Sequence, residues 1–169
     1  MKAFAELYAE LDATTSSNAK LAAMQAYFAK AEPQDAAWAV YFLSGGRPRQ
    51  LVPVRILREL AVAVSGLTPW LFEESYQSVG DLAETISLVL PENPHSSDAG
   101  LAEWIEDKLL PLRGETPESL SLQLPALWVQ LDRPSLMLCI KLITGSFRVG
   151  VSKLLVTRAL ASMAGLDSK

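Results

Sequence analysis

Short segments with a helical period, several of them opened by proline, are the feature that most limits how this chain can fold. The first segment has apolar residues at the spacing i, i+3, i+4, i+7, namely Phe4, Leu7, Tyr8 and Leu11. Proline suits the first turn of a helix, where its missing N–H is not needed. Prolines precede five later apolar runs of helical period, at Pro33, Pro53, Pro69, Pro117 and Pro134. The pattern predicts an all-α domain of about ten short helices.

One segment could form a strand instead of a helix. Residues 119–124 alternate between polar and apolar, but they have no hairpin partner. We interpret them as helix that runs towards a break near Pro125. The segment 91–97, which contains Pro, Asn and Ser, is short and is typical of a loop inside a domain. We therefore expect residues 1–169 to form one compact domain.

An internal repeat is the strongest sign of organisation along the chain. Residues 40–45 match residues 140–145 at an offset of 100 positions. Each copy contains an apolar helix, a turn in which Ser or Thr precedes Gly, a basic segment, and a second amphipathic helix that ends at Gly. The copies, roughly 36–67 and 135–166, predict internal two-fold pseudo-symmetry with two equivalent turns on one face.

The two turns combine residue types that suit phosphate. Glycine lets a backbone approach its partner closely, a helix N-terminus offers unpaired N–H groups, and arginine carries fork-shaped donors. The first turn supplies the candidates Ser44, Gly45, Gly46, Arg47 and Arg49. The second supplies Thr144, Gly145, Arg148, Gly150, Ser152 and Lys153, and Lys20 is expected to add a peripheral contact from the N-terminal turn. A structural interpretation stays open, because glycine commonly ends a helix and serine commonly caps one.

The charge of the chain is unevenly distributed. The net charge of −4 argues, as a single number, against a nucleic-acid binder. However, residues 44–72 contain four arginines and one glutamate, a net of +3, and residues 133–166 contain five cations and no acid, a net of +5. Residues 73–118 contain eleven acids and two cations, a net of −9. Because local potential decides what binds where, both turns remain candidates for an anionic ligand.

Several other classes of site are disfavoured by the residues present. The single cysteine, Cys139, excludes an internal disulfide and a multi-cysteine zinc site, and the single histidine, His95, excludes a two-histidine metal site. We expect no catalytic residue and no metal ligand. The longest uncharged stretches have 13 residues, whereas a membrane-spanning helix needs about 20. We therefore expect no membrane partner and a cytoplasmic protein.

Four stretches resemble one known family. Residues 141–152, K-L-I-T-G-S-F-R-V-G-V-S, resemble a segment of the N-terminal DNA-binding domain of ATP-dependent DNA ligases, above all the bacterial type. Residues 4–28 resemble the opening helix, polar turn and helix of that domain. Residues 80–84, G-D-L-A-E, and 109–114, L-L-P-L-R-G, are similar to two further motifs. The resemblance follows the family order over nearly the whole chain.

The resemblance implies an all-helical, pseudo-symmetric domain that grips nicked duplex DNA across the minor groove. Contacts would be mainly to the sugar-phosphate backbone, without sequence preference, and would position the nick for sealing in DNA repair, replication or recombination. Sealing would belong to a separate nucleotidyltransferase domain, with its lysine in a K-x-D-G motif, and to an OB-fold domain. No K-x-D-G occurs in these 169 residues. We therefore expect this chain alone to bind DNA and not to act as an enzyme.

The same resemblance sets the expected cofactors and partners. No cofactor is expected in this chain, and ATP and Mg²⁺ are expected only for the full-length ligase. The implied partners are nicked double-stranded DNA and the catalytic domains of the same polypeptide. We expect a monomer that associates with the nucleoid in the cytoplasm.

The first turn departs from the family pattern, which leaves an alternative open. It reads Arg47-Pro48-Arg49-Gln50 where the second turn reads R-V-G-V-S, and Pro48 removes a backbone donor. In the first turn, the arginine side chains must therefore contribute more of the binding to DNA. The rival hypothesis is a helical protein-interaction or scaffold module without direct DNA contact, because the apolar residues, 50% of the chain, could form an exposed patch.

Overall fold

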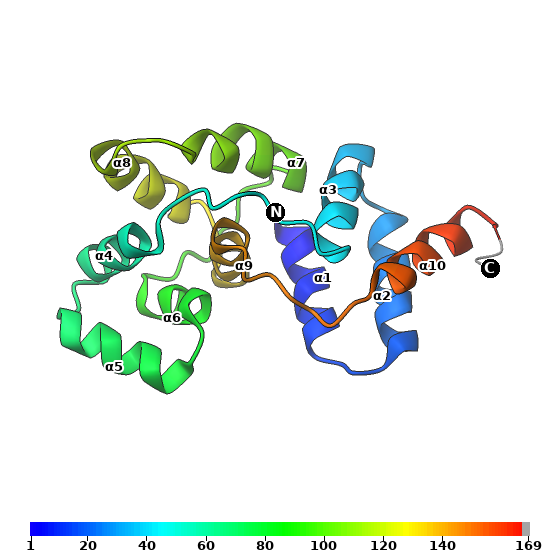
Figure 1. The fold of residues 1–169 in the computed structure, drawn as a ribbon, viewed down its shortest axis with the longest axis horizontal. Coiled ribbons are helices and arrows are strands. Elements are labelled where there is room, and N and C mark those ends of the chain that lie inside the picture. The colour runs from blue at the N-terminus through cyan, green and yellow to red at the C-terminus, as the bar shows by residue number, and fades with distance from the viewer. Residues whose placement is uncertain (167–169) are drawn as a thin grey trace.

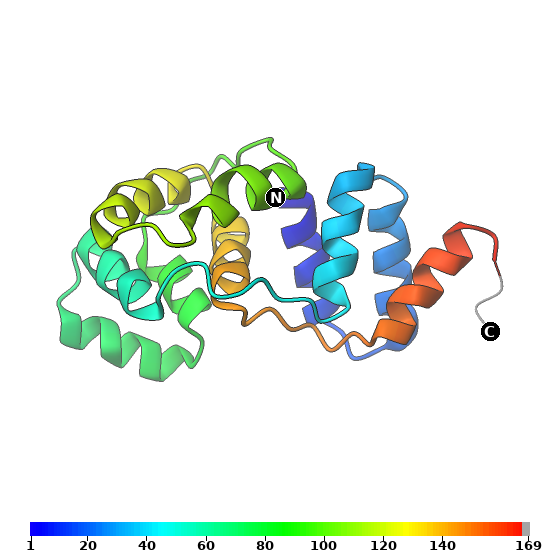
Figure 2. The same cartoon turned by 45° about the horizontal axis from the view of Figure 1, so that its top comes forward.

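The computed structural model describes residues 1–166, and these residues form an all-α fold (Figures 1 and 2). Within this range there are ten α-helices and no strand, which confirms the predicted fold class. The helices are α1 (Lys2–Asp12), α2 (Ser17–Phe28), α3 (Pro33–Leu43), α4 (Val54–Ser65), α5 (Pro69–Val79), α6 (Leu82–Val89), α7 (Leu101–Glu103), α8 (Pro117–Trp128), α9 (Arg133–Thr144) and α10 (Lys153–Met163). A π-helical turn, η1 (Trp104–Leu109), and a 3₁₀ turn, η2 (Leu110–Leu112), continue α7. None of the described helices is long and apolar enough to cross a membrane.

The helix starts follow the polar and proline signals in the sequence. Three helices begin with proline as their first residue, at Pro33, Pro69 and Pro117. Pro53 directly precedes α4, and Pro134 is the second residue of α9. The hydroxyls of Ser16 and Thr116 accept hydrogen bonds from the backbone N–H groups three residues later, at 3.3 and 3.2 Å. These contacts satisfy donors that a helix start otherwise leaves unpaired.

The ambiguous segment 119–124 is helical, as predicted, but the expected break near Pro125 is wrong. Helix α8 continues through this proline to Trp128. The missing N–H of Pro125 leaves only the carbonyl of Ser121 without its helical donor, and Ser121 is exposed to water. The carbonyl of Pro125 still accepts a hydrogen bond from the N–H of Val129, at 3.2 Å. One lost bond on a solvated face is therefore tolerated near the end of the helix.

The molecule has two lobes joined by two connections that run in opposite directions. Figures 1 and 2 show α1, α2, α3 and α10 in the first lobe and α4, α5, α6, α8 and α9 in the second. Residues 44–53, here the first linker, run from α3 to α4 in the second lobe. Residues 144–152, the second linker, run in the opposite sense from α9 to α10 in the first lobe. Helix α1 packs against α9 and joins the lobes.

Elements and packing recur about a hundred residues apart. Helices α2 and α8 begin at Ser17 and Pro117, and α3 and α9 begin at Pro33 and Arg133. The packing recurs too, because α2 packs against α10 and α8 against α4, while α9 packs against α1 and α3 against α7. The correspondence starts earlier than the predicted repeats at 36–67 and 135–166. A two-fold axis between the copies stays a prediction.

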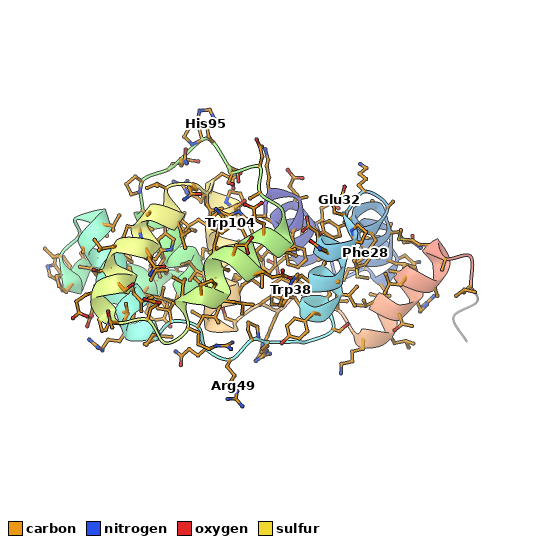
Figure 3. The ribbon with its side chains drawn as sticks, turned by 90° about the horizontal axis from the view of Figure 1, so that it is seen from above. Phe28, Glu32, Trp38, Arg49, His95 and Trp104 are labelled. Carbon is orange, nitrogen blue, oxygen red and sulfur yellow. The ribbon has the colours of Figure 1, made fainter. Side chains whose placement is uncertain are left out.

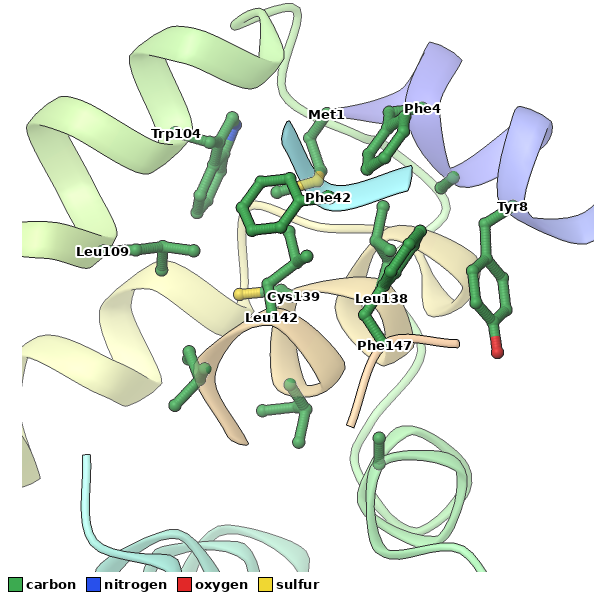
Figure 4. Packing of buried hydrophobic residues seen from close by; sticks show 14 of the residues in the cluster. Met1, Phe4, Tyr8, Phe42, Trp104, Leu109, Leu138, Cys139, Leu142 and Phe147 are labelled. Carbon is green, nitrogen blue, oxygen red and sulfur yellow. The ribbon is translucent and has the colours of Figure 1, made fainter. Parts of the chain in front are cut away.

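The core continues into the second linker. Eight of the twelve residues of α9 are buried, so this helix forms the centre of the fold. Phe147 of the second linker stacks on Phe4, with ring centroids 5.6 Å apart, and Figure 4 shows both rings in the core. Burial raises the pKa of the Cys139 thiol to about 12, so this cysteine is structural and unreactive. The second linker is thus fixed to the core by an aromatic side chain.

Candidate functional site

The structure brings the two linkers together on one face of the molecule. A shallow hollow is lined by Ser44, Gly45 and Arg47 of the first linker and by residues 147–151 of the second. A Cβ placed on Gly145 would lie 3.9 Å from Cδ of Arg47. Most of the predicted site residues, although a hundred positions apart in sequence, therefore share one surface.

The second linker begins with a compact glycine cap. Gly145 has φ +71°, which favours glycine, and its N–H donates to the carbonyl of Lys141. The N–H of Ser146 donates to the same carbonyl at 3.0 Å. The hydroxyl of Thr144 donates to the carbonyl of Ile140 at 2.9 Å and lies 2.9 Å from the hydroxyl of Ser146. Thr144 is thus engaged in the cap, while Ser146, which sequence reasoning missed, is exposed.

Beyond the cap, the second linker alternates between buried and exposed residues. Phe147 and Val149 are buried, whereas Arg148 and Gly150 are exposed. Arg148 lies between these two buried residues, and its side chain remains on the solvent side. Ser152 then caps α10, its hydroxyl accepting from the N–H of Leu155 at 3.1 Å. The second linker therefore carries the exposed Arg148 four residues before Ser152, the residue that caps α10.

Lys20 is buried against the second linker. It is 7% exposed, and its ammonium donates to the carbonyls of Val149 at 2.6 Å and Gly150 at 3.1 Å. A peripheral contact of Lys20 with DNA stays a prediction, and the structure adds an internal contact that the sequence did not indicate. Lysine commonly keeps its ammonium in water, but here two carbonyl oxygens of the second linker replace that water.

The first linker is shaped by its contact with α3. Gly45 has φ +88°, and the N–H of Gly46 donates to the carbonyl of Tyr41 at 2.8 Å. A Cβ on Gly46 would lie 2.5 Å from that carbonyl oxygen, so glycine is required there by internal packing. Arg47 and Arg49 are exposed. Figure 3 shows Arg49 projecting from one long edge of the molecule, with His95 on the opposite edge.

Ion pairing separates the candidate cations from their neighbours. The nine cations that gave the two basic segments their positive charge include four that are paired with acids, namely Arg55 with Glu59, Arg58 with Glu73, Arg133 with Glu92 and Lys141 with Asp81. The candidates Arg47, Arg49, Arg148 and Lys153 are exposed and belong to none of the ion pairs within residues 1–166. Arg158 of α10, the ninth cation, is also exposed and outside these ion pairs. The positive charge available to a ligand is therefore smaller than the sequence tally and lies on the linkers and on α10.

One ion pair joins two of the sequence motifs. Asp81, from G-D-L-A-E, lies 2.6 Å from the ammonium of Lys141, from K-L-I-T-G. Partial burial pushes the pKa of Asp81 up, but hydrogen bonds from Lys141 and from the N–H of Glu84 outweigh it, so this pKa lies below its usual value. Burial lowers the pKa of Lys141, but Asp81 outweighs this too and holds it above its usual value. Sequence reasoning missed this contact.

A second hollow beside the second linker has mixed charge. It is lined by Asp12, Asp81 and Glu84 together with Lys141 and Arg148. Its acids oppose an anion at that point, whereas the hollow between the linkers is lined by arginine, lysine and glycine and by no acid. An anionic ligand is thus favoured on the linkers and not in this neighbouring hollow.

Comparison with protein families decides the class of the chain. A family model described as DNA ligase N terminus matches residues 1–161. The chain belongs to the DNA ligase N-terminus family. No curated protein matched the chain in a separate search.

Membership of the DNA ligase N-terminus family confirms the predicted N-terminal ligase domain, while the bacterial type stays a prediction. The family is not the catalytic nucleotidyltransferase domain, and it associates this chain with the function of DNA ligases. Both linkers lie inside the matched range.

Proposed function

We propose that this chain binds nicked duplex DNA through the sugar-phosphate backbone, across the minor groove and without sequence specificity. Binding would position the nick for the nucleotidyltransferase domain of the same ligase in repair, replication or recombination. The observation that carries the proposal is a group of exposed cations outside ion pairs on the linkers and at the start of α10: Arg47, Arg49, Arg148 and Lys153. Arg47 and Arg49 lie on the first linker, Arg148 lies on the second, and Lys153 begins α10. Arg47, Arg148 and Lys153 line the same hollow between the linkers.

The chemistry of these groups favours phosphate over base edges. Guanidinium and ammonium groups neutralise phosphates and release the counterions that surround DNA, so affinity falls steeply with salt. Such contacts fix the position and orientation of a protein on the duplex without reading sequence. Glycines in both linkers allow the backbone to come close to the ligand. A domain that must bind any nick needs this sequence-independent grip.

The net charge of −4 does not oppose this binding. Figure 3 shows Arg49 on one edge of the molecule, while Glu32 lies toward the opposite side. A duplex on the linkers would meet the positive potential of the hollow between them, which no acid lines, because local charges outweigh the net charge when salt screens those beyond about 10 Å. ATP and Mg²⁺ would act only in the full-length ligase, and this chain would bind DNA as a monomer without a cofactor.

Substitution of Arg148 by glutamate tests the proposal. Fluorescence anisotropy with a nicked duplex should show at least about tenfold weaker binding for Arg148→Glu at low salt. A salt series should also show a slope of log affinity against log salt that is lower by about one unit, because one phosphate contact is lost.

The matched control is Lys30→Glu, which makes the same change of net charge. Lys30 is exposed in the connection between α2 and α3, two residues from Glu32 and away from the linkers. It should change affinity by less than about twofold, because Lys30 lines a separate hollow with Glu6, Glu10 and Glu32 and does not line the hollow between the linkers. Equal losses in both variants would contradict the proposed face, since net charge alone would then explain binding.

A partly exposed apolar groove supports the rival function of a protein-interaction module. Trp38, Tyr41, Pro48 and Leu110 line this groove between α3, the first linker and η2. Such a surface suits a partner chain. Passage of the protein over a heparin or DNA column at low salt separates the two functions, because the scaffold function predicts flow-through and DNA binding predicts retention.

A further inference from the structure

We infer that Lys20 is a positioning residue, which holds the second linker so that its N–H groups and Arg148 face the DNA. The inference rests on the proposed function and gives Lys20 a role other than contact with phosphate. Lys20 lies in the first turn of α2, and the carbonyls that it binds lie 129 and 130 residues later. It is therefore a tertiary anchor for a segment that otherwise has few polar contacts.

The charged ammonium of Lys20 is solvated by backbone carbonyls of the second linker. It belongs to none of the ion pairs within residues 1–166, and its hydrogen bonds go to the carbonyls of Val149 and Gly150. A buried cation without partners would be strongly unfavourable, so these two carbonyls must stay aimed at Lys20. The lysine consequently fixes the orientation of two successive peptide planes.

That orientation decides where the N–H groups of the linker point. In a trans peptide the C=O and the following N–H point in opposite directions, and the described chain has no cis bond. With the carbonyls of residues 149 and 150 directed inward, the N–H groups of Gly150 and Val151 are directed away from Lys20. Neither N–H has a bonded acceptor within residues 1–166. They are thus available to a phosphate next to the exposed Arg148.

Gly150 is matched to this lysine. It has φ +59°, and a Cβ at this position would lie 3.1 Å from the ammonium nitrogen of Lys20. That distance is closer than a carbon and an ammonium nitrogen normally approach. The ammonium therefore has room to reach both carbonyls because residue 150 has no side chain. A side chain at Gly150 would disturb the anchor while leaving every charge of the protein in place.

The substitution Lys20→Met tests the inference, because it keeps the length of the side chain and removes the donor. Binding to a nicked duplex should weaken about tenfold, as expected when hydrogen bonds from a charged group are lost. The salt slope should stay at the wild-type value, because no phosphate contact disappears. The losses from Lys20→Met and Arg148→Ala should be non-additive in a double-mutant cycle, because the first acts partly through the second.

A second variant keeps the test decisive if Lys20→Met fails to fold. Gly150→Ala should weaken binding with an unchanged salt slope and without any loss of charge. Gly66→Ala is its control, since Gly66 also has a positive φ, at the end of α4, but has open space around it. Gly66→Ala should lower stability by a similar amount and leave DNA affinity within about twofold of wild type.

Three outcomes would overturn the inference. Wild-type affinity in Lys20→Met would do so, and so would a salt slope lowered by about one unit with additive losses, which would identify Lys20 as a direct phosphate contact. The third concerns the backbone of the free protein. The inference predicts that the ¹⁵N order parameters of residues 148–151 fall from about 0.85 towards 0.6 or below in Lys20→Met, and unchanged values would contradict it. This last measurement uses no DNA, so it separates failure of the inference from failure of the proposed function.

Discussion

Lys20 and Leu120 hold the same place in two corresponding helices, yet they are chemically opposite. Each is the fourth residue of its helix, α2 or α8, and each helix is capped by a hydroxyl, from Ser16 or Thr116. Both side chains are buried, with 7% and 2% of their surface exposed. Helix α2 packs against α10, which follows the second linker, and α8 packs against α4, which follows the first. One arrangement of helices thus supports two linkers in different ways.

The difference continues into the linkers. The second linker offers the carbonyls of Val149 and Gly150 to the lysine, whereas the first ends in two buried apolar residues, Leu51 and Val52. Burial of apolar side chains fixes the path of a chain but does not set which way each peptide plane faces. The polar anchor does set it, and so directs backbone donors outward. We therefore expect the first linker to bind DNA mainly with the side chains of Arg47 and Arg49, and the second with backbone and side chain together.

Replacing Leu120 of α8 by lysine, the residue at the corresponding position 20 of α2, should produce the largest effect on stability. Leu120→Lys would place an ammonium at a buried position of α8, the helix that packs against α4. We expect the free energy of unfolding to fall by about 3 kcal/mol, because the charge would have no partner. Urea unfolding at pH 7 measures this. Leu120→Met, the control, keeps an apolar side chain of similar volume and should lower stability by less than about 1.5 kcal/mol. Similar losses in the two variants would mean that the first linker already provides carbonyls for a lysine.

The glycines of the two caps give a smaller contrast. Gly46 matches Ser146 at the offset of 100, but a Cβ on Gly46 would lie 2.5 Å from the carbonyl oxygen of Tyr41. The ring of Tyr41 packs edge-on against Trp38 and Phe42, which restricts its movement. Gly46→Ala should therefore lower the free energy of unfolding by about 2 kcal/mol.

The control for this contrast is Ser146→Ala, in the corresponding position of the second linker. Ser146 already carries a Cβ and is exposed, so the change should stay within about 0.5 kcal/mol in the same urea experiment. Equal losses in the two alanine variants would remove the distinction between the caps.

The fold was largely predictable, because its signals are local. Helical spacing and the prolines at helix starts act within a few residues, and they predicted the class and the number of helices. Pro125 misled the prediction, since whether a proline ends a helix depends on how near the helix end lies and on whether the freed carbonyl meets water. The candidate glycines at positions 45, 145 and 150 do adopt positive φ.

The structure brings residues of the two predicted turns together in one hollow, but the contacts of the neighbouring lysines could not be predicted. Neither the contact of Lys20 with Gly150 nor that of Lys141 with Asp81 has a local signal, because the partners lie 130 and 60 residues away. A lysine near a basic turn is expected to face solvent, and only tertiary packing turns it inward. The sequence therefore identified the linkers, while the distinction between cations that anchor and cations that remain exposed required the structure.

The ion pair of Asp81 with Lys141 gives the smallest and last test, because the first copy has Tyr41 in place of Lys141. The substitution Asp81→Asn keeps a side chain that caps α6 and removes the charge. At pH 7 we expect a loss of about 1 kcal/mol, reduced because Asp81 is partly exposed to solvent. The folded-state pKa of Asp81 lies below its usual 3.8, so the stabilisation is present above that value and is lost as the pH falls through the folded-state pKa. Urea unfolding from about pH 7 to about pH 2 should show the wild-type and Asp81→Asn curves of stability against pH converging in acid.

The control for this test is Glu10→Gln. Glu10 is exposed and belongs to no ion pair within residues 1–166, so the stability curve of this variant should stay parallel to wild type. A difference for Asp81→Asn that persists at the acid end would assign the loss to the helix cap, and the ion pair would then cease to distinguish the second copy from the first.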